Sequence, residues 1–184
     1  MSRSLSAVRI EAERIVLRKL QESDRERLIE LRTDPEVGAY IGGPQTREAV
    51  ERRIAEVGMA KLGDVPGLFI IADKATDILL GTMQLMPRPS DRPGHLTADG
   101  DELEIGYLLH RSAWGRGYAF EAAAAILRAG AAELPDQPVI LITQAANTRS
   151  RRLADRLGFQ LVRTFEAYDA EQTLSAADLH TFKA

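Results

Sequence analysis

The segment from Asp101 to Glu133 constrains the fold of this chain more than any other part of its sequence. It begins with an apolar run, Leu103 to Leu109, whose Ile, Leu and Tyr residues predict a buried strand. A polar break and the sequence Trp-Gly-Arg-Gly-Tyr-Ala at 114–119 follow, and an alanine-rich run of about fourteen residues then predicts a helix. A strand, a glycine loop and a helix N-terminus in this order leave backbone N–H groups free to hold a phosphate. The segment therefore predicts a site for a phosphorylated ligand.

Two common phosphate-binding patterns do not fit this segment. The mononucleotide loop G-x-x-x-x-G-K-[ST] is absent, and the dinucleotide pattern G-x-G-x-x-G would place its third glycine at Phe120, which is too bulky for close packing of helix on strand. The remaining alternative to a phosphate site is a helix that follows a flexible turn, and the short motif alone does not decide between them.

Length and composition limit the other options. The 184 residues suit one domain over 1–184 with a substantial core, and a net charge of −3 gives no overall field to attract nucleic acid. The chain has no cysteine, which excludes disulfides, zinc-thiolate sites and a cysteine nucleophile. Its three histidines are isolated in sequence, so we expect no metal site. No signal-peptide core or membrane-length apolar run occurs, so we expect a cytoplasmic protein without a membrane partner.

Hydrophobic periodicity and turn residues predict the other elements of the chain. Strands are expected at 14–20, 67–72, 78–86, 139–143, 160–165 and around 180–182. Helices are expected from a Ser23-x-x-Glu26 capping box, after Thr46, over 119–132, and from 147 to Gly158. The stretch 87–100 is the longest irregular one, and a loop of that length is either functional or disordered. This order of elements predicts an α/β fold on a mostly antiparallel sheet with one parallel crossover.

Five short motifs in this order resemble the GNAT superfamily of acetyl-coenzyme A-dependent N-acyltransferases. Their sequences are Arg-Ile-Val-Leu-Arg at 14–18, Glu-Ile-Gly-Tyr at 104–107, Trp-Gly-Arg-Gly-Tyr-Ala at 114–119, Asn-Thr-Arg-Ser at 147–150 and Leu-Gly-Phe at 157–159. Together they are most similar to the branch of ribosomal-protein N-terminal acetyltransferases (RimJ/RimL-like). The resemblance implies a mixed, mostly antiparallel sheet of about six to seven strands, flanked by about four helices.

The resemblance also implies where acetyl-CoA would bind. The pyrophosphate would be held mainly by backbone N–H groups and the helix dipole, and an arginine in the loop could add a charged contact. An asparagine just past the strand end could contact the pantetheine, although asparagine there also suits a helix N-cap. The family's Gln/Arg position is occupied by tryptophan in this chain. The expected coenzyme-binding residues are Trp114, Gly115, Arg116, Gly117, Tyr118, Ala119 and Asn147.

Two residues are expected to carry the chemistry. Many relatives place a tyrosine acid three residues before Leu-Gly-Phe, but that position is Ala154, and the branch resembled uses a serine, here Ser150, as acid or thiolate hydrogen-bond donor. The alternative role for Ser150 is to serve the first helical turn. Glu104 is the expected base, directly or through water, because it precedes Ile-Gly-Tyr on the strand beside the loop and shares a face with Gly106. Asp101 and Glu102 are alternates.

The predicted function is direct acetyl transfer from acetyl-CoA to a primary amine in a ternary complex. A covalent acyl-enzyme is not expected, because there is no cysteine and no G-x-S-x-G elbow. The acceptor would be a protein N-terminal α-amine or a small-molecule amine, and the oligomeric state stays open, with a homodimer as one option. The alternative is a non-catalytic coenzyme-A-binding or sensor domain on the same fold, which Ala154 in place of tyrosine would suit.

Overall fold

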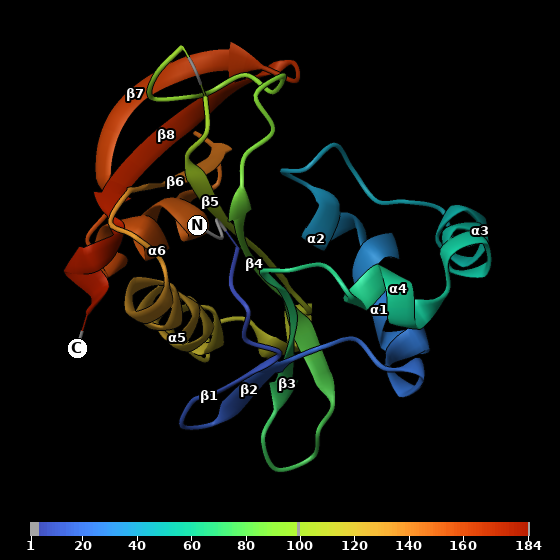
Figure 1. Ribbon diagram of the computed structural model, residues 1–184. Coiled ribbons are helices and arrows are strands. Elements are labelled where there is room, and N and C mark those ends of the chain that lie inside the picture. The colour runs from blue at the N-terminus through green and yellow to red at the C-terminus, as the bar shows by residue number, and fades with distance from the viewer. Residues whose placement is uncertain (1–3, 99, 184) are drawn as a thin grey trace.

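An eight-stranded sheet forms the centre of the computed structural model, which describes residues 4–98 and 100–183. The strand order is β1-β2-β3-β4-β5-β6-β8-β7, and every neighbouring pair is antiparallel except β5 and β6 (Figure 1). The strands are β1 (Arg9–Glu11), β2 (Ile15–Arg18), β3 (Leu68–Asp73), β4 (Leu79–Pro87), β5 (Leu103–Leu109), β6 (Pro138–Gln144), β7 (Gln160–Ala167) and β8 (Ala170–Asp178).

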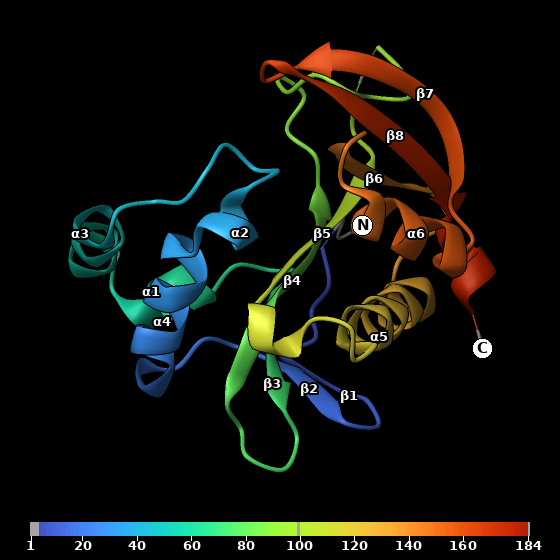
Figure 2. The same cartoon turned by 180° about the vertical axis from the view of Figure 1, so that it is seen from behind.

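Helices cover both faces of the sheet. The chain runs through α1 (Arg25–Thr33), α2 (Pro35–Gly38), α3 (Arg47–Val57), α4 (Met59–Gly63), α5 (Tyr118–Glu133) and α6 (Thr148–Leu157). Three 3-10 helices, η1 (Glu22–Asp24), η2 (Arg111–Ala113) and η3 (Leu179–Phe182), complete the described part. From the front and from behind, α1–α4 lie on one side of the sheet and α5 and α6 on the other (Figures 1 and 2).

Each face of the sheet has its own hydrophobic cluster. On the α5 side, buried Leu103 and Ile105 of β5 pack with Ile126 and Leu127 of α5. On the α1–α4 side, Ile29, Ile54 and Met59 pack against β2 and β3. A sheet that is buried on both faces needs apolar residues throughout its central strands, which is the pattern of Phe69–Ala72 in β3.

The turn from β2 into α1 is set by a buried ion pair rather than by the expected capping box at Ser23. Both terminal nitrogens of Arg18 donate to the Asp24 carboxylate, at 2.8 and 2.9 Å, and the Gln21 N–H donates to the same carboxylate at 2.8 Å. Asp24 therefore fixes η1, and α1 begins at Arg25, one residue later than the capping box would start it. Thr46, by contrast, caps α3 as expected, since its hydroxyl accepts from the Ala49 N–H at 3.2 Å.

The predicted α/β class, the mostly antiparallel sheet and its one parallel crossover are confirmed, while the element counts are not. The structure has eight strands where six to seven were expected, and six α-helices among the described residues where about four were expected. The strand expected around His180 is wrong, because Leu179–Phe182 is a 3-10 helix and the last strand is Ala170–Asp178. The strand β8 pairs with β6 on one side and with β7 on the other. Its residues are therefore buried by this pairing and not because they are strongly apolar.

Candidate coenzyme and acceptor site

The two parallel strands separate soon after they begin to pair. β5 and β6 are in register only at Leu103–Val139 and Glu104–Ile140, and no pairing follows between their C-terminal halves. The β4 pairing fixes which backbone groups of β5 face this opening. The His110 N–H donates to the Leu80 carbonyl, and the Arg88 N–H donates to the Glu102 carbonyl. The backbone N–H and C=O groups of the even-numbered β5 residues therefore hydrogen-bond to β4. Backbone N–H and C=O groups of successive residues point to opposite sides of a strand, so those of Ile105 and Tyr107 face β6.

The N-terminus of α5 offers a row of free N–H groups beside this opening. Gly115 and Gly117 have φ angles of +72° and +80°, which favour glycine, and Gly117 is the N-cap without a side-chain cap. In the described part of the chain, none of the backbone N–H groups from Gly115 to Phe120 donates to a protein acceptor. Unpaired N–H groups at a sixteen-residue helix form an anion site, so the geometry fits a pyrophosphate.

Arg14 and Glu121 fasten this loop to the sheet. Glu121 Oε1 accepts from the Arg14 backbone N–H at 2.6 Å, and Oε2 accepts from the Arg14 Nε at 2.8 Å. The Arg14 Nη1 donates to the Arg116 carbonyl at 2.9 Å, and its guanidinium lies 4.7 Å from the centre of the Tyr118 ring. These contacts hold the loop in place before any ligand arrives, and they explain why the Arg-Ile-Val-Leu-Arg motif accompanies the glycine loop.

Trp114 lies under the loop as a packing residue. Its indole Nε1 donates to the Leu109 carbonyl at 2.9 Å, and the Arg149 guanidinium stacks 4.3 Å from the ring centre. The ring packs against the hydrophobic clusters of both faces. The tryptophan in the family's Gln/Arg position therefore links β5, the glycine loop and α6. Arg116 is exposed, while Ala119 packs against the α5-side cluster.

The N-terminus of α6 lies across the opening from β5. The Asn147 Oδ1 accepts from the Ser150 N–H at 3.2 Å, so Asn147 is the N-cap of α6, and its amide nitrogen has no partner among the described residues. The Ser150 side chain is buried and lies near the Tyr107 phenol of β5, close enough to influence the pKa of that phenol. Burial raises the pKa of Tyr107, more than the Ser150 side chain lowers it, so the phenol stays protonated at neutral pH. Two hydroxyl groups thus meet between β5 and α6.

Glu104 lies on the opposite face of β5 and is held by a buried arginine. Its Oε1 accepts from Arg88 Nη1 at 2.8 Å, with side-chain exposures of 14% for Glu104 and 4% for Arg88. No described residue bonds to Glu104 Oε2. Register partners share a sheet face, so Glu104 and Gly106 of β5 stand beside Met86 and Gln84 of β4. The carboxylate is therefore positioned through one oxygen, and the other oxygen has no partner among the described residues.

Residues 88–98 and 100–102 form an arch that hydrogen bonds hold together. Buried Glu102 accepts from the Leu96 N–H at 2.6 Å, from the Thr97 N–H at 3.2 Å, and bonds His95 Nδ1 at 2.6 Å. Burial by itself would raise the pKa of Glu102, but the hydrogen bonds to its carboxylate have the larger combined effect and lower that pKa. The arch reaches β7, where Arg163 donates to the His95 carbonyl at 2.8 Å. Glu102 was expected as an alternate base, but its carboxylate instead hydrogen-bonds to His95, Leu96 and Thr97 within this arch.

Two residues that line the site were not singled out from the sequence. Tyr107 was assigned to a motif but given no role, and Arg88 was placed in the irregular stretch. The signal for Tyr107 was available, because a tyrosine three residues after Glu104 falls on the other face of a strand. Nothing in the sequence pairs Arg88 with Glu104, because that contact joins the end of β4 to the start of β5. No group of three or more His, Asp or Glu residues in the described ranges could hold a metal ion. No helix there has the length and apolarity to cross a bilayer.

Comparison with known proteins agrees with this geometry. Residues 14–160 match the Acetyltransferase (GNAT) domain family. The uncharacterized N-acetyltransferase p20 of Bacillus licheniformis is 29% identical over 159 residues, which are 84% of this chain and 85% of the relative. The GNAT-family acetyltransferase structure from Bacillus anthracis is 25% identical, with a TM-score of 0.74 over 93% of this chain and 98% of that one.

A more distant structure carries the coenzyme. It is the spermidine N-acetyltransferase of Vibrio cholerae in complex with CoA and spermine, 13% identical, with a TM-score of 0.68 over 92% of this chain and 98% of that one. At that identity the likeness shows a common fold. The domain match, which spans well over half of the sequence, shows more: the chain belongs to the GNAT family of acetyltransferases.

Proposed function

We propose that this protein transfers an acetyl group from acetyl-CoA to a primary amine, and that the amine is an N-terminal α-amine, as in the RimJ/RimL-like branch. The observation that supports this best is the geometry around β5. The free N–H groups of α5 and the open edge of β5 suit a pyrophosphate and a pantetheine chain, and Glu104 stands on the acceptor-side face of the same strand.

Each residue has a role in this reaction. Glu104 Oε2 takes a proton from the acceptor ammonium, directly or through water, and the neutral nitrogen attacks the thioester carbonyl carbon. The Tyr107 N–H, which faces β6, stabilises the negative oxygen that forms there. The carbon–sulfur bond then breaks, and the leaving thiolate accepts the proton of the Ser150 hydroxyl. The attacking nitrogen releases its second proton to solvent, a proton returns from solvent to Ser150 by way of the nearby Tyr107 phenol, and Glu104 releases its proton to solvent. The products are the N-acetylated amine and coenzyme A.

The energy needed to deprotonate the amine favours an α-amine. A lysine-type amine with a pKa near 10.4 costs about 4.6 kcal/mol to deprotonate at pH 7, whereas an α-amine with a pKa near 8 costs about 1.4 kcal/mol. A positioned base contributes about 10²- to 10⁴-fold. Since one carboxylate, already bonded to Arg88, is the only base we assign, the α-amine is the easier substrate.

The test is thiol release from acetyl-CoA over a panel of α-amines, ε-amines and polyamines. We expect turnover on α-amines, with no acetyl-enzyme trapped when the acceptor is omitted. Ala154, which is buried where many relatives have a tyrosine, is the feature that favours a non-catalytic coenzyme-binding domain. Tight coenzyme A binding with no turnover on any amine would establish that alternative. A stable acetyl-enzyme would overturn direct transfer, and no coenzyme binding at all would overturn both.

A further inference from the structure

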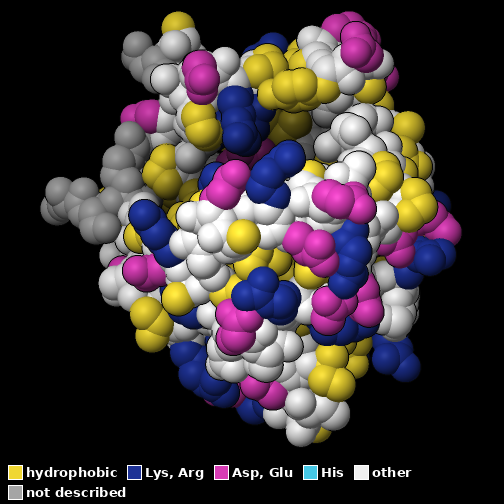
Figure 3. Space-filling view, turned by 90° about the vertical axis from the view of Figure 1, so that its right-hand side faces the viewer, with side chains coloured by type: hydrophobic (Ala, Val, Ile, Leu, Met, Phe, Trp, Pro, Cys, Tyr) yellow, Lys and Arg dark blue, Asp and Glu magenta, His cyan; other side chains and the backbone are white. Residues whose placement is uncertain are grey.

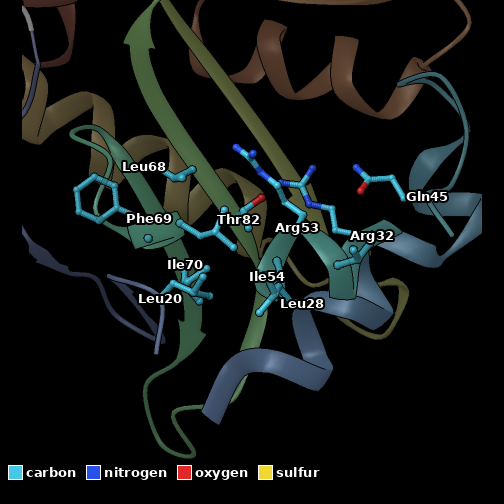
Figure 4. Close-up of a pocket in the computed structure, with 13 residues that line it drawn as sticks. Leu20, Leu28, Arg32, Gln45, Arg53, Ile54, Leu68, Phe69, Ile70 and Thr82 are labelled. Carbon is cyan, nitrogen blue, oxygen red and sulfur yellow. The ribbon is translucent and has the colours of Figure 1, made fainter. Parts of the chain in front are cut away.

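A cavity of about 280 Å³ lies on the acceptor side of the sheet. Its walls come from α1, α3, α4 and the strands β3 and β4 (Figure 4). Most of the lining is apolar, as at Leu28, Ile54 and Phe69, and a few polar groups reach into it. Such a mainly apolar hollow with a small number of polar groups is typical of a small-ligand pocket. The face over α1–α4 shows a hollow with Lys and Arg side chains beside it, interspersed with Asp and Glu side chains (Figure 3).

The charged groups of this cavity are all positive. Arg32 of α1 and Arg53 of α3 extend into the same region, and no aspartate or glutamate is among the lining residues (Figure 4). Neither guanidinium has a hydrogen bond or an ion pair with any described residue. Burial lowers the pKa of Arg32, and an arginine remains charged even so. The buried Arg18 and Arg88 of this protein are paired with Asp24 and Glu104, so Arg32 is left without the counter-charge that they have.

The cavity and Glu104 are connected along one face of β4. Thr82, which lines the cavity, and Met86, which stands opposite Glu104, point to the same side of the sheet, with Gln84 between them. Met86 is four positions along the strand from Thr82, a distance of about 13 Å. An extended peptide covers about 3.3–3.6 Å per residue. A ligand anchored at the arginines would thus reach Glu104 with a backbone of about three to four residues.

We propose that the cavity binds an anionic group of the acceptor, a carboxylate or a phosphate, which pairs with Arg32 and Arg53. Resting on the proposed function, this inference names the acceptor class: a peptide whose N-terminal amine reaches Glu104 and whose acidic side chain stands at about its third or fourth residue. Charge-assisted bonds to guanidinium groups supply the selectivity. Polyamines, which bring positive charge to this cavity, are poor acceptors.

The experiment compares the kcat/KM of acetyl transfer to short peptides that differ only in one side chain. The side chain at position three or four is aspartate, phosphoserine, asparagine or lysine, and a further peptide carries aspartate at position six. We expect the aspartate or phosphoserine peptides to exceed the asparagine peptide about 10- to 100-fold, and the lysine peptide to be poorest. The ratio of aspartate to phosphoserine distinguishes the two anions. Equal rates across the panel would overturn the proposal.

Variants then assign the selectivity to the cavity. Arg53→Gln should remove most of the preference for the acidic peptide, and Arg53→Glu should shift it toward the lysine peptide, a reversal that simple loss of structure would not produce. Arg52→Gln is the matched control, because Arg52 is exposed on the same helix and does not line the cavity. Arg32→Gln, checked by thermal melting, should act like Arg53→Gln. A preference that survives both neutral variants contradicts the proposal.

A binding measurement that requires no acetyl transfer tests the anion site independently of the proposed function. Calorimetric titration with the N-acetylated acidic peptide and its asparagine counterpart measures the cavity alone. Preference for the acidic product, lost in Arg53→Gln, supports the anion site even if transfer proves slow. Turnover on neutral and cationic amines without any acidic preference would leave the transferase standing and overturn the anion site.

Discussion

A few single side chains carry the chemistry that we propose for the opening between β5 and β6. Motif spacing predicts roles for Glu104 and Ser150, and the structure adds the residues that surround these two side chains. It shows that Arg88 holds Glu104, and that the Ser150 hydroxyl lies near the Tyr107 phenol. Both contacts join residues from different elements, so no local pattern reports them. Asn147 was given two roles from sequence, and its N-cap bond to Ser150 is present. Its contact with coenzyme remains a prediction, as do the other site roles.

The Tyr107–Ser150 pair leads to a prediction about proton delivery. If both hydroxyls act as one relay to the leaving thiolate, Ser150→Ala and Tyr107→Phe should each lower kcat by about 10²-fold, the low end for a general acid. The double variant should lose little more than the worse single one, because the members of one relay are not additive. Steady-state kinetics of the four proteins measure this. Losses that multiply would show two independent roles.

His110 leads to a prediction about stability and pH. The His110 ring is buried, its Nε2 donates to the Arg27 carbonyl of α1 at 2.8 Å, and burial lowers its pKa below the usual 6.5 despite that bond. The unfolded chain therefore binds a proton near pH 6.5 that the folded chain does not, so stability falls as pH drops below 6.5. His110→Gln keeps a donor but has no proton to gain. Denaturant unfolding measures the free energy of unfolding of both proteins from pH 7 to pH 5. Over this range the wild type should lose more stability than His110→Gln, and a difference between the two that stays constant would contradict this.

At the scale of elements, the best predictions came from segments with local signals. The strand, the glycine loop and α5 follow from apolar runs, glycine placement and alanine content, and the structure has them where expected. The strand β8 was missed because Gln172, Thr173 and Ser175 give it little apolar character, although pairing on both sides buries them. The strand β1 was missed because it has three residues, two of them charged, and lies at the sheet edge. Pairing partners distant in sequence decide both cases.

The α5 N-terminus leads to a prediction about coenzyme affinity. Gly117→Ala forces a side chain into a left-handed backbone conformation, at a cost of about 1–2 kcal/mol, and disturbs the N–H groups assigned to the pyrophosphate. Coenzyme A affinity should fall about tenfold or more. Gly158→Ala is the matched control, because Gly158 has a φ of +91° at the C-cap of α6 with no atom within 4 Å of an added Cβ. It should destabilise the fold similarly while leaving affinity unchanged. Equal losses of affinity would remove the pyrophosphate role from the α5 loop.

At the scale of the whole molecule, the two faces of the sheet divide the work. The α5 and α6 side carries the free N–H groups and hydroxyls that we assign to the coenzyme, and the α1–α4 side carries Glu104 and the basic cavity that we assign to the acceptor. Fold class and family followed from the sequence because its motifs recur in order along most of the chain. The acceptor did not, because the residues that line the proposed acceptor cavity come from five separate elements and two loops and include no motif. That residues 1–184 form one functional domain remains a prediction.

The most direct test of the central claim compares wild type with Glu104→Gln in two assays on the same protein. One assay is kcat/KM for acetyl transfer to an N-terminal α-amine, and the other is the dissociation constant for coenzyme A. Glu166→Gln, at an exposed position on β7, is the control for loss of a carboxylate. We predict that Glu104→Gln loses about 10²- to 10⁴-fold in kcat/KM with unchanged coenzyme affinity. Full activity in Glu104→Gln, or an equal loss in Glu166→Gln, would contradict the assignment of Glu104 as the base.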